Sequence, residues 1–71
     1  MVTYIYEYEV FIEVSYDGRW EPFTRMEIDA ASSVTGGRLA LDIVLERFPN
    51  LIGRLRISAS NSVGRRELPR G

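Results

Sequence analysis

The side chains in this sequence that could carry out chemistry are mainly carboxylates spaced along its N-terminal part. They stand at odd positions and are Glu7, Glu9, Glu13, Glu21 and Glu27. Neighbouring carboxylates catalyse acid–base reactions only where burial or crowding makes one an acid and the other a base. Glu7 and Glu9 could also ligate Mg²⁺, although a solvated strand face has the same pattern.

The residues that the chain lacks limit its chemistry further. It contains no His, no Cys and no Lys. Thiolate nucleophiles, imidazole bases and zinc sites built from Cys and His are therefore excluded. We predict a protein that is not an enzyme, with no catalytic residue, no metal site and no cofactor.

Length and charge restrict the classes of partner. The chain has 71 residues, a formal net charge of −1 and nine basic residues, all of them Arg. A net charge near zero gives no long-range attraction to nucleic acid. No run of about 18 apolar residues is present, and no basic segment precedes an apolar one as in a signal peptide. The sequence therefore predicts a cytoplasmic protein without a membrane segment.

Residues 2–16 show the alternation of a long β-strand. The apolar side chains occupy the even positions Val2, Tyr4, Tyr6, Tyr8, Val10, Ile12, Val14 and Tyr16. Period-two alternation rich in aromatic and β-branched residues predicts a strand. Its length exceeds that of a usual strand, so we expect it to be the central one.

A hairpin is predicted to follow at residues 15–18. A two-residue loop would place charged residues opposite the apolar face of the first strand. A three-residue loop with a glycine bulge instead pairs even positions with even positions, which sets Val14 beside Trp20. We predict this second register because it keeps the apolar residues on one face. Pro22 has no ladder donor, so the second strand, residues 19–30, should lie at a sheet edge.

A helix is predicted over residues 34–48. Candidate N-caps precede it, and Pro49 ends it. Gly36 and Gly37 are expected to weaken its first turn. The stretch from Thr35 to Arg38 is a possible anion cradle at a helix start, but it lacks the spacing of a phosphate loop, and a loosely wound turn is the preferred interpretation.

The remaining elements complete the topology. Residues 51–60 form a predicted third strand, which ends a single α+β domain over residues 1–60, and residues 61–71 form a polar, basic tail. A right-handed crossover gives a three-stranded sheet of order 2-1-3 with one helix packed across one face, a ββαβ fold. The helix is expected to cover the even face of the hairpin, Trp20 included.

The other face of this sheet is predicted to be open and is the first candidate binding surface. It would display Phe11 directly opposite Phe23, with charged residues around them. Aromatic anchors inside a charged rim are typical of a protein-contact patch, although a stabilising cross-strand pair gives the same pattern. The predicted protein-binding residues are Ile5, Glu9, Phe11, Phe23, Arg25, Arg54 and Arg56.

A second candidate surface is the flank of the helix that carries Leu39 and Ile43. The helix is apolar over more than half of its circumference, which is wider than the stripe that a surface helix buries. We predict that this flank mediates self-association, with a homodimer as the expected state. The alternative is that it packs beneath the C-terminal tail or beside the third strand.

The hairpin resembles that of the archaeal ribosomal protein LX family. The segment Gly18-Arg19-Trp20-Glu21-Pro22-Phe23-Thr24-Arg25 and the helix start after Ala30 match that family over about the first half of the chain. The resemblance implies a strand–strand–helix–strand fold and binding to ribosomal RNA. Arg65, Arg66 and Arg70 are the residues available for such binding, which is the alternative function.

In composition the chain is also similar to accessory proteins of phages that infect actinobacteria. The features shared are small size, no Cys, and Arg in place of Lys. This similarity implies a protein that binds and modulates a host protein. We therefore predict a small protein-binding module whose partner is a protein, with RNA binding as the competing class.

Overall fold

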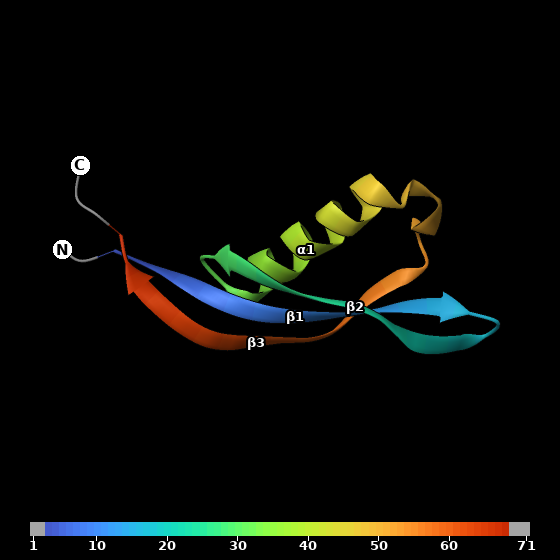
Figure 1. The fold of residues 1–71 in the computed structure, drawn as a ribbon, viewed down its shortest axis with the longest axis horizontal. Helices are drawn as coiled ribbons and strands as arrows, with labels where there is room; N and C mark the ends of the chain where they lie inside the picture. The colour runs from blue at the N-terminus through green and yellow to red at the C-terminus, as the bar shows by residue number, and fades with distance from the viewer. Residues whose placement is uncertain (1–2, 69–71) are drawn as a thin grey trace.

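The computed structural model describes residues 3–68, which form three strands and one α-helix (Figure 1). The elements are β1 (Tyr4–Tyr16), β2 (Arg19–Ala30), α1 (Ser33–Arg47), a short 3₁₀ helix (Pro49–Leu51) and β3 (Leu55–Glu67). The sheet is antiparallel with strand order β2-β1-β3, and α1 packs on one face. The predicted α+β class, the ββαβ element order and the 2-1-3 sheet are confirmed.

The turn between β1 and β2 is shorter than predicted. Asp17 and Gly18 form a two-residue loop, with φ of 53° and 75°, and Tyr16 pairs directly with Arg19. Positive φ at both positions is the geometry of the primed turns that match strand twist. The predicted three-residue loop is therefore wrong.

A β-bulge in β2 then restores the apolar parity. Between the pairs Glu13–Pro22 and Ile12–Thr24 the register shifts, which leaves Phe23 as the extra residue. Beyond the bulge, even residues of β2 face even residues of β1, as expected. Before the bulge they do not, so Trp20 pairs with Ser15. Trp20 therefore lies on the face away from α1, which corrects its predicted position.

β3 is longer and less regular than predicted. It pairs with β1 as far as Glu67, so residues 61–67 belong to the sheet instead of a tail. The register shifts twice, at Ser58 and at Val63, and each bulge moves the following side chains to the other face. Ala59 consequently faces Phe11 on the open side. Residues 69–71, with Arg70, lie outside the described part of the chain.

The core is small and lies under the middle of the helix. Its buried apolar residues are Tyr8, Val10, Ile12, Ala30, Ala40 and Val44. A helix of 15 residues is about 22 Å long, whereas a strand of 13 residues is about 43 Å long. The two ends of the sheet therefore extend beyond α1 in opposite directions (Figure 1).

Gly37 lets α1 approach the sheet closely, because a Cβ there would lie 3.3 Å from Cγ1 of Ile57. At the neighbouring Gly36 a Cβ would lie at an ordinary contact distance of 3.4 Å from Cδ2 of Tyr8. Ser32 begins the helix by accepting a hydrogen bond from the backbone N–H of Thr35 at 3.2 Å. From the sequence, these two glycines were expected to weaken the first turn or to form an anion cradle. In the structure they are buried and form part of the face of α1 that contacts the sheet.

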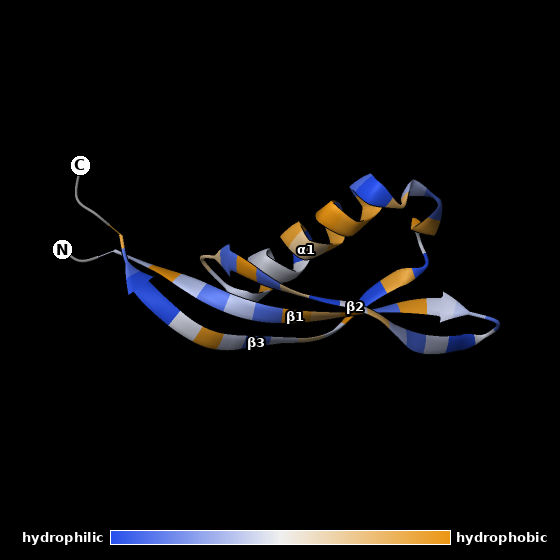
Figure 2. Ribbon diagram, in the orientation of Figure 1, coloured by the Kyte–Doolittle hydropathy of each residue, from blue (hydrophilic) through white to orange (hydrophobic). Residues whose placement is uncertain are grey.

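Val44 and Leu41 of α1 pack in or against the core, whereas two other large apolar side chains of α1 lie outside the contact. Leu39 and Ile43 are 41% and 44% exposed, and Figure 2 shows apolar residues along the visible side of the middle of α1. No helix within residues 3–68 is long and apolar enough to cross a membrane.

Candidate protein-binding surfaces

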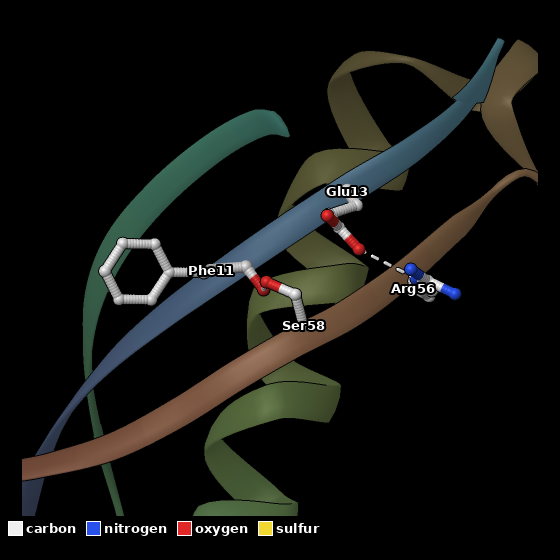
Figure 3. A network of polar contacts seen from close by, with 4 residues as sticks. All are labelled: Phe11, Glu13, Arg56 and Ser58. Carbon is white, nitrogen blue, oxygen red and sulfur yellow. Dashed lines mark hydrogen bonds and ion pairs between the residues drawn. The ribbon is translucent and has the colours of Figure 1, made fainter. Parts of the chain in front are cut away.

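The first surface is the open sheet face, defined as the side of the sheet away from α1. Figure 3 views this face, with α1 behind the strands. Phe11 lies at its centre and is half-buried, and its backbone oxygen accepts a hydrogen bond from Oγ of Ser58 at 3.4 Å. Phe11 pairs with Arg25 on β2 and with Ala59 on β3. The predicted placement of Phe11 on this face is supported by these pairs.

A hollow of about 250 Å³ lies beside Phe11 on β2. Its lining is mostly apolar, with one acid and one base, and consists of Phe11, Ile12, Glu13, Pro22, Phe23, Thr24, Arg25 and Ser58. The bulge at Phe23 widens the spacing along β2 at this point and so helps to form the hollow. An apolar side chain of a partner would fit this hollow, and the charged groups at the rim of the hollow would surround it.

Phe23 takes a different position from the one predicted. As the bulge residue it has no direct partner on β1, so it does not oppose Phe11. Its ring instead meets that of Phe48 at the end of α1, edge to face, with 5.5 Å between centroids. Phe23 remains 37% exposed and forms the outer wall of the hollow.

Three ion pairs connect the strands across the open sheet face. Glu9 pairs with Arg25 at 3.0 Å, Glu13 pairs with Arg56 at 2.8 Å, and Asp29 pairs with Arg66. The dashed line in Figure 3 marks the second of these. Pairs this exposed contribute only about 0.2–1 kcal/mol each to stability. The first two pairs hold charged side chains in fixed positions near Phe11, whereas the third lies beside Ile5 toward the other end of β1.

The two arginines predicted from the start of β3 have different roles. The guanidinium of Arg56 stacks over the ring of Trp20 at 4.3 Å, in addition to its ion pair. Arg54 donates from Nη2 and Nε to the backbone oxygen of Ser15, at 2.8 and 3.3 Å. Arg56 therefore belongs to the open sheet face, whereas Arg54 ties the start of β3 to the end of β1.

Ile5 is also on the open sheet face but far from the hollow. It is half-buried and pairs with Arg66 near the other end of β1. Six residues along a strand separate Ile5 from Phe11 by about 20 Å. The structure thus places Glu9, Phe11, Arg25 and Arg56 on the middle of the open sheet face. Phe23 lines the hollow but its ring lies against Phe48 of α1, and Ile5 and Arg54 lie elsewhere.

The second surface lies along the outer edge of β2. A concavity of about 450 Å³ is formed there by an apolar wall of Ile28, Leu39 and Ile43 and an acidic wall of Glu7, Glu27 and Asp29. Leu39 and Ile43 are one helical turn apart and so lie on the same side of α1. Within residues 3–68, neither Glu7 nor Glu27 forms an ion pair. The helix flank predicted for self-association therefore faces the edge of β2.

Several residues of these surfaces were not predicted. Pro22 and Ser58 line the hollow, but the bulges that place them leave no signal in the alternation. Glu27 and Asp29 were visible as acidic residues of the second strand. Their place beside Leu39 and Ile43 depends on how α1 crosses the sheet, which the sequence pattern does not determine.

The basic residues near the end of β3 do not form one patch. Arg65 stacks over Tyr4 at 4.3 Å, whereas Arg66 pairs with Asp29 on the other face. Consecutive residues of a strand point to opposite sides, so these two cations are separated by the sheet. In the described part of the chain, no three acidic side chains cluster closely enough to hold a metal ion.

Comparison with known proteins gives no match to this chain among protein families, curated protein sequences or solved structures.

Proposed function

We propose that this chain is a non-enzymatic protein-binding module that docks on a partner protein through the open sheet face. The observation that carries the proposal is the hollow beside Phe11, which combines an apolar lining with fixed charges at its rim. Binding energy in protein interfaces concentrates in such pockets, where an aromatic or aliphatic anchor is surrounded by polar contacts that exclude water.

The rim restricts the chemistry of the partner. Glu9, Arg25, Glu13 and Arg56 present both signs of charge within ion pairs. A partner segment with one apolar anchor and mixed charges beside it matches this rim, because complementary charges fix the orientation of a complex. The compositional similarity to phage accessory proteins makes a cytoplasmic host protein the proposed class of partner.

The distribution of the arginines favours a protein over RNA as partner. Within residues 3–68, Arg19, Arg25, Arg56 and Arg66 are each paired with a carboxylate. RNA binding needs a continuous basic surface with exposed aromatic rings. On the open sheet face, phosphate groups would meet Glu7, Glu9 and Glu13 as well as the arginines.

The test compares Phe11→Ala with Tyr16→Ala in affinity capture from host lysate, with and without nuclease. Tyr16 is on the same strand, 60% exposed, and its even position puts it on the opposite face, so it is the matched control. The proposal expects a partner protein that resists nuclease and is lost with Phe11→Ala only. The partner is then purified, and its dissociation constant is expected to rise at least about tenfold for Phe11→Ala.

Thermal unfolding of both variants shows whether lost binding reflects lost folding. A partner that disappears after nuclease treatment, or one that Phe11→Ala retains at full affinity, would contradict the proposal.

A further inference from the structure

The outer edge of β2 offers a regular stretch of strand with nothing paired to it. From Thr24 to Ala30, seven residues pair with β1 without a register shift, and this stretch contains no Pro and no Gly. No other segment in the part of the chain that the structure describes pairs with its outer side. Such an edge presents a row of unused backbone donors and acceptors, which is a template for another strand.

The concavity beside this edge selects the kind of strand that can be added. Ile28, Leu39 and Ile43 form its wall on the side of α1, and Glu7 and Glu27 form part of the wall on the open side. Side chains of an added strand alternate between these two sides. The strand that fits therefore carries apolar or small side chains on one face and a cation on the other.

β2 itself has this composition. Thr24 and Met26 lie on the side of α1, and Arg25 lies on the open side, as their pairing with β1 shows. A second copy of β2, added antiparallel about a two-fold axis, would place both helices on the same face of a six-stranded sheet. We propose that the partner at this edge is a second copy of this chain, which pairs β2 to β2.

The charges on β2 determine the register of this pairing. Directly opposed residues share a face of the sheet. The two-fold axis must therefore lie midway between the two copies of one residue, which then oppose each other, and the register is named by that residue. An axis at Arg25 would oppose two arginines, one at Glu27 would oppose two glutamates, and one at Ile28 would oppose Glu27 and Asp29. An axis at Met26 instead opposes Arg25 and Glu27 twice, once on each side of the axis.

The structure therefore assigns Met26 to the two-fold axis. In this register Thr24 of the second copy lies opposite Ile28, beside the apolar wall formed by Leu39 and Ile43. Arg25 of the second copy lies opposite Glu27, which has no ion-pair partner within residues 3–68. Both walls of the concavity are thus complemented by the same strand.

A charge-reversal series tests the proposal by sedimentation equilibrium of the full chain. The wild type is expected to dimerise with a dissociation constant at or below about 100 μM. Arg25→Glu and Glu27→Arg each oppose like charges twice and are expected to weaken the dimer at least about tenfold. The double variant restores opposite charges at both positions and is expected to recover the wild-type dissociation constant within about threefold.

Asn61→Arg is the matched control for Glu27→Arg. Glu9 pairs with Glu27 on one side and with Asn61 on the other, so both variants add a cation next to the same glutamate. Only the variant on β2 is expected to weaken the dimer. Because Glu27→Arg and Asn61→Arg each add an attractive partner for Glu9, circular dichroism should show both folded.

Single cysteines read out the register, since the chain contains none of its own. Under oxidation Met26→Cys is expected to form a disulfide-linked dimer, and Glu27→Cys is not, because directly opposed residues are within disulfide reach and diagonal ones are not. A monomer at all concentrations, equal dimerisation of Glu27→Arg and wild type, or preferential crosslinking of Glu27→Cys would overturn the proposal. Loss of the partner in the Phe11→Ala capture experiment leaves this result unchanged, so the two proposals fail separately.

Discussion

β2 and β3 are the two outer edges of one sheet, and β2 contains the longer stretch of regular pairing. β2 pairs with β1 without interruption from Thr24 to Ala30, whereas β3 shifts register at Ser58 and again at Val63. Bulges twist an edge and remove its regular pattern of donors and acceptors, which prevents pairing with another chain. β3 is therefore poorly suited to pair with another strand, whereas residues 24–30 of β2 retain the regular geometry that strand addition needs.

The two sides of α1 also differ in the charge of the groups beside them. Leu39 and Ile43 form the wall of an apolar and acidic concavity beside β2. Beside β3, a hollow of about 330 Å³ is lined by Ser33, Val34, Gly37, Arg38, Leu41, Ile57 and Ser60. The lining of this hollow is also mostly apolar, with a cation and no carboxylate, so what distinguishes the concavity beside β2 is its acidic wall.

The largest expected effect is on self-association, from a charge placed beside β2. Ile43→Glu should raise the dissociation constant of the dimer at least about a hundredfold, because the interface would bury an unpaired carboxylate. Since Ile43 is 44% exposed in the single chain, the folded monomer should keep its helical circular dichroism spectrum. Sedimentation equilibrium measures the change.

Val34→Glu is the control on the side of β3. Val34 is 71% exposed, and its substitution should leave the dissociation constant within about twofold of wild type. Equal weakening by the two variants would remove the distinction between the edges.

A smaller effect is expected on stability, from the glycines that seat α1 on the sheet. Gly37→Val should destabilise the fold by about 1–3 kcal/mol, because its side chain would crowd Ile57 on β3. Gly36→Ala should stabilise it by up to about 1 kcal/mol, because Ala favours the helix and its Cβ would make ordinary contacts with Tyr8 and Ala30. Urea unfolding of both variants measures the two free energies, and stabilisation by Gly37→Val would contradict this account of the helix contact.

Much of the fold could be predicted from the sequence because the apolar alternation of β1 is long and uninterrupted. The alternation identified β1 as the central strand, Pro22 placed β2 at an edge, and Pro49 marked the end of the helix. These features follow from the burial of apolar side chains and from the missing backbone N–H of proline, and both can be identified from the residue types alone.

The details that could not be predicted all depend on bulges or on close packing. The bulge at Phe23 separates it from Phe11, and the short turn before it moves Trp20 to the open sheet face. The continuation of β3 beyond residue 60 could not be predicted, because the bulge at Ser58 changes the phase of the alternation within a polar segment. From the sequence alone, Gly37 predicts only a weakened helix. Its role in the close contact with Ile57 depends on the packing of α1 against β3, which the sequence does not reveal.

We propose that β2 is the edge at which a second strand pairs. Amide hydrogen exchange across a concentration series tests it most directly, because paired edge amides exchange more slowly than unpaired ones. Between about 10 μM and about 1 mM, the exchange of outward-facing amides in residues 24–30 should slow at least about fourfold, because the monomer fraction falls by that factor at a dissociation constant of about 100 μM. Amides in residues 57–65 of β3 should keep their exchange rates. Concentration-independent exchange in β2, or slowing in β3 instead, would contradict the account.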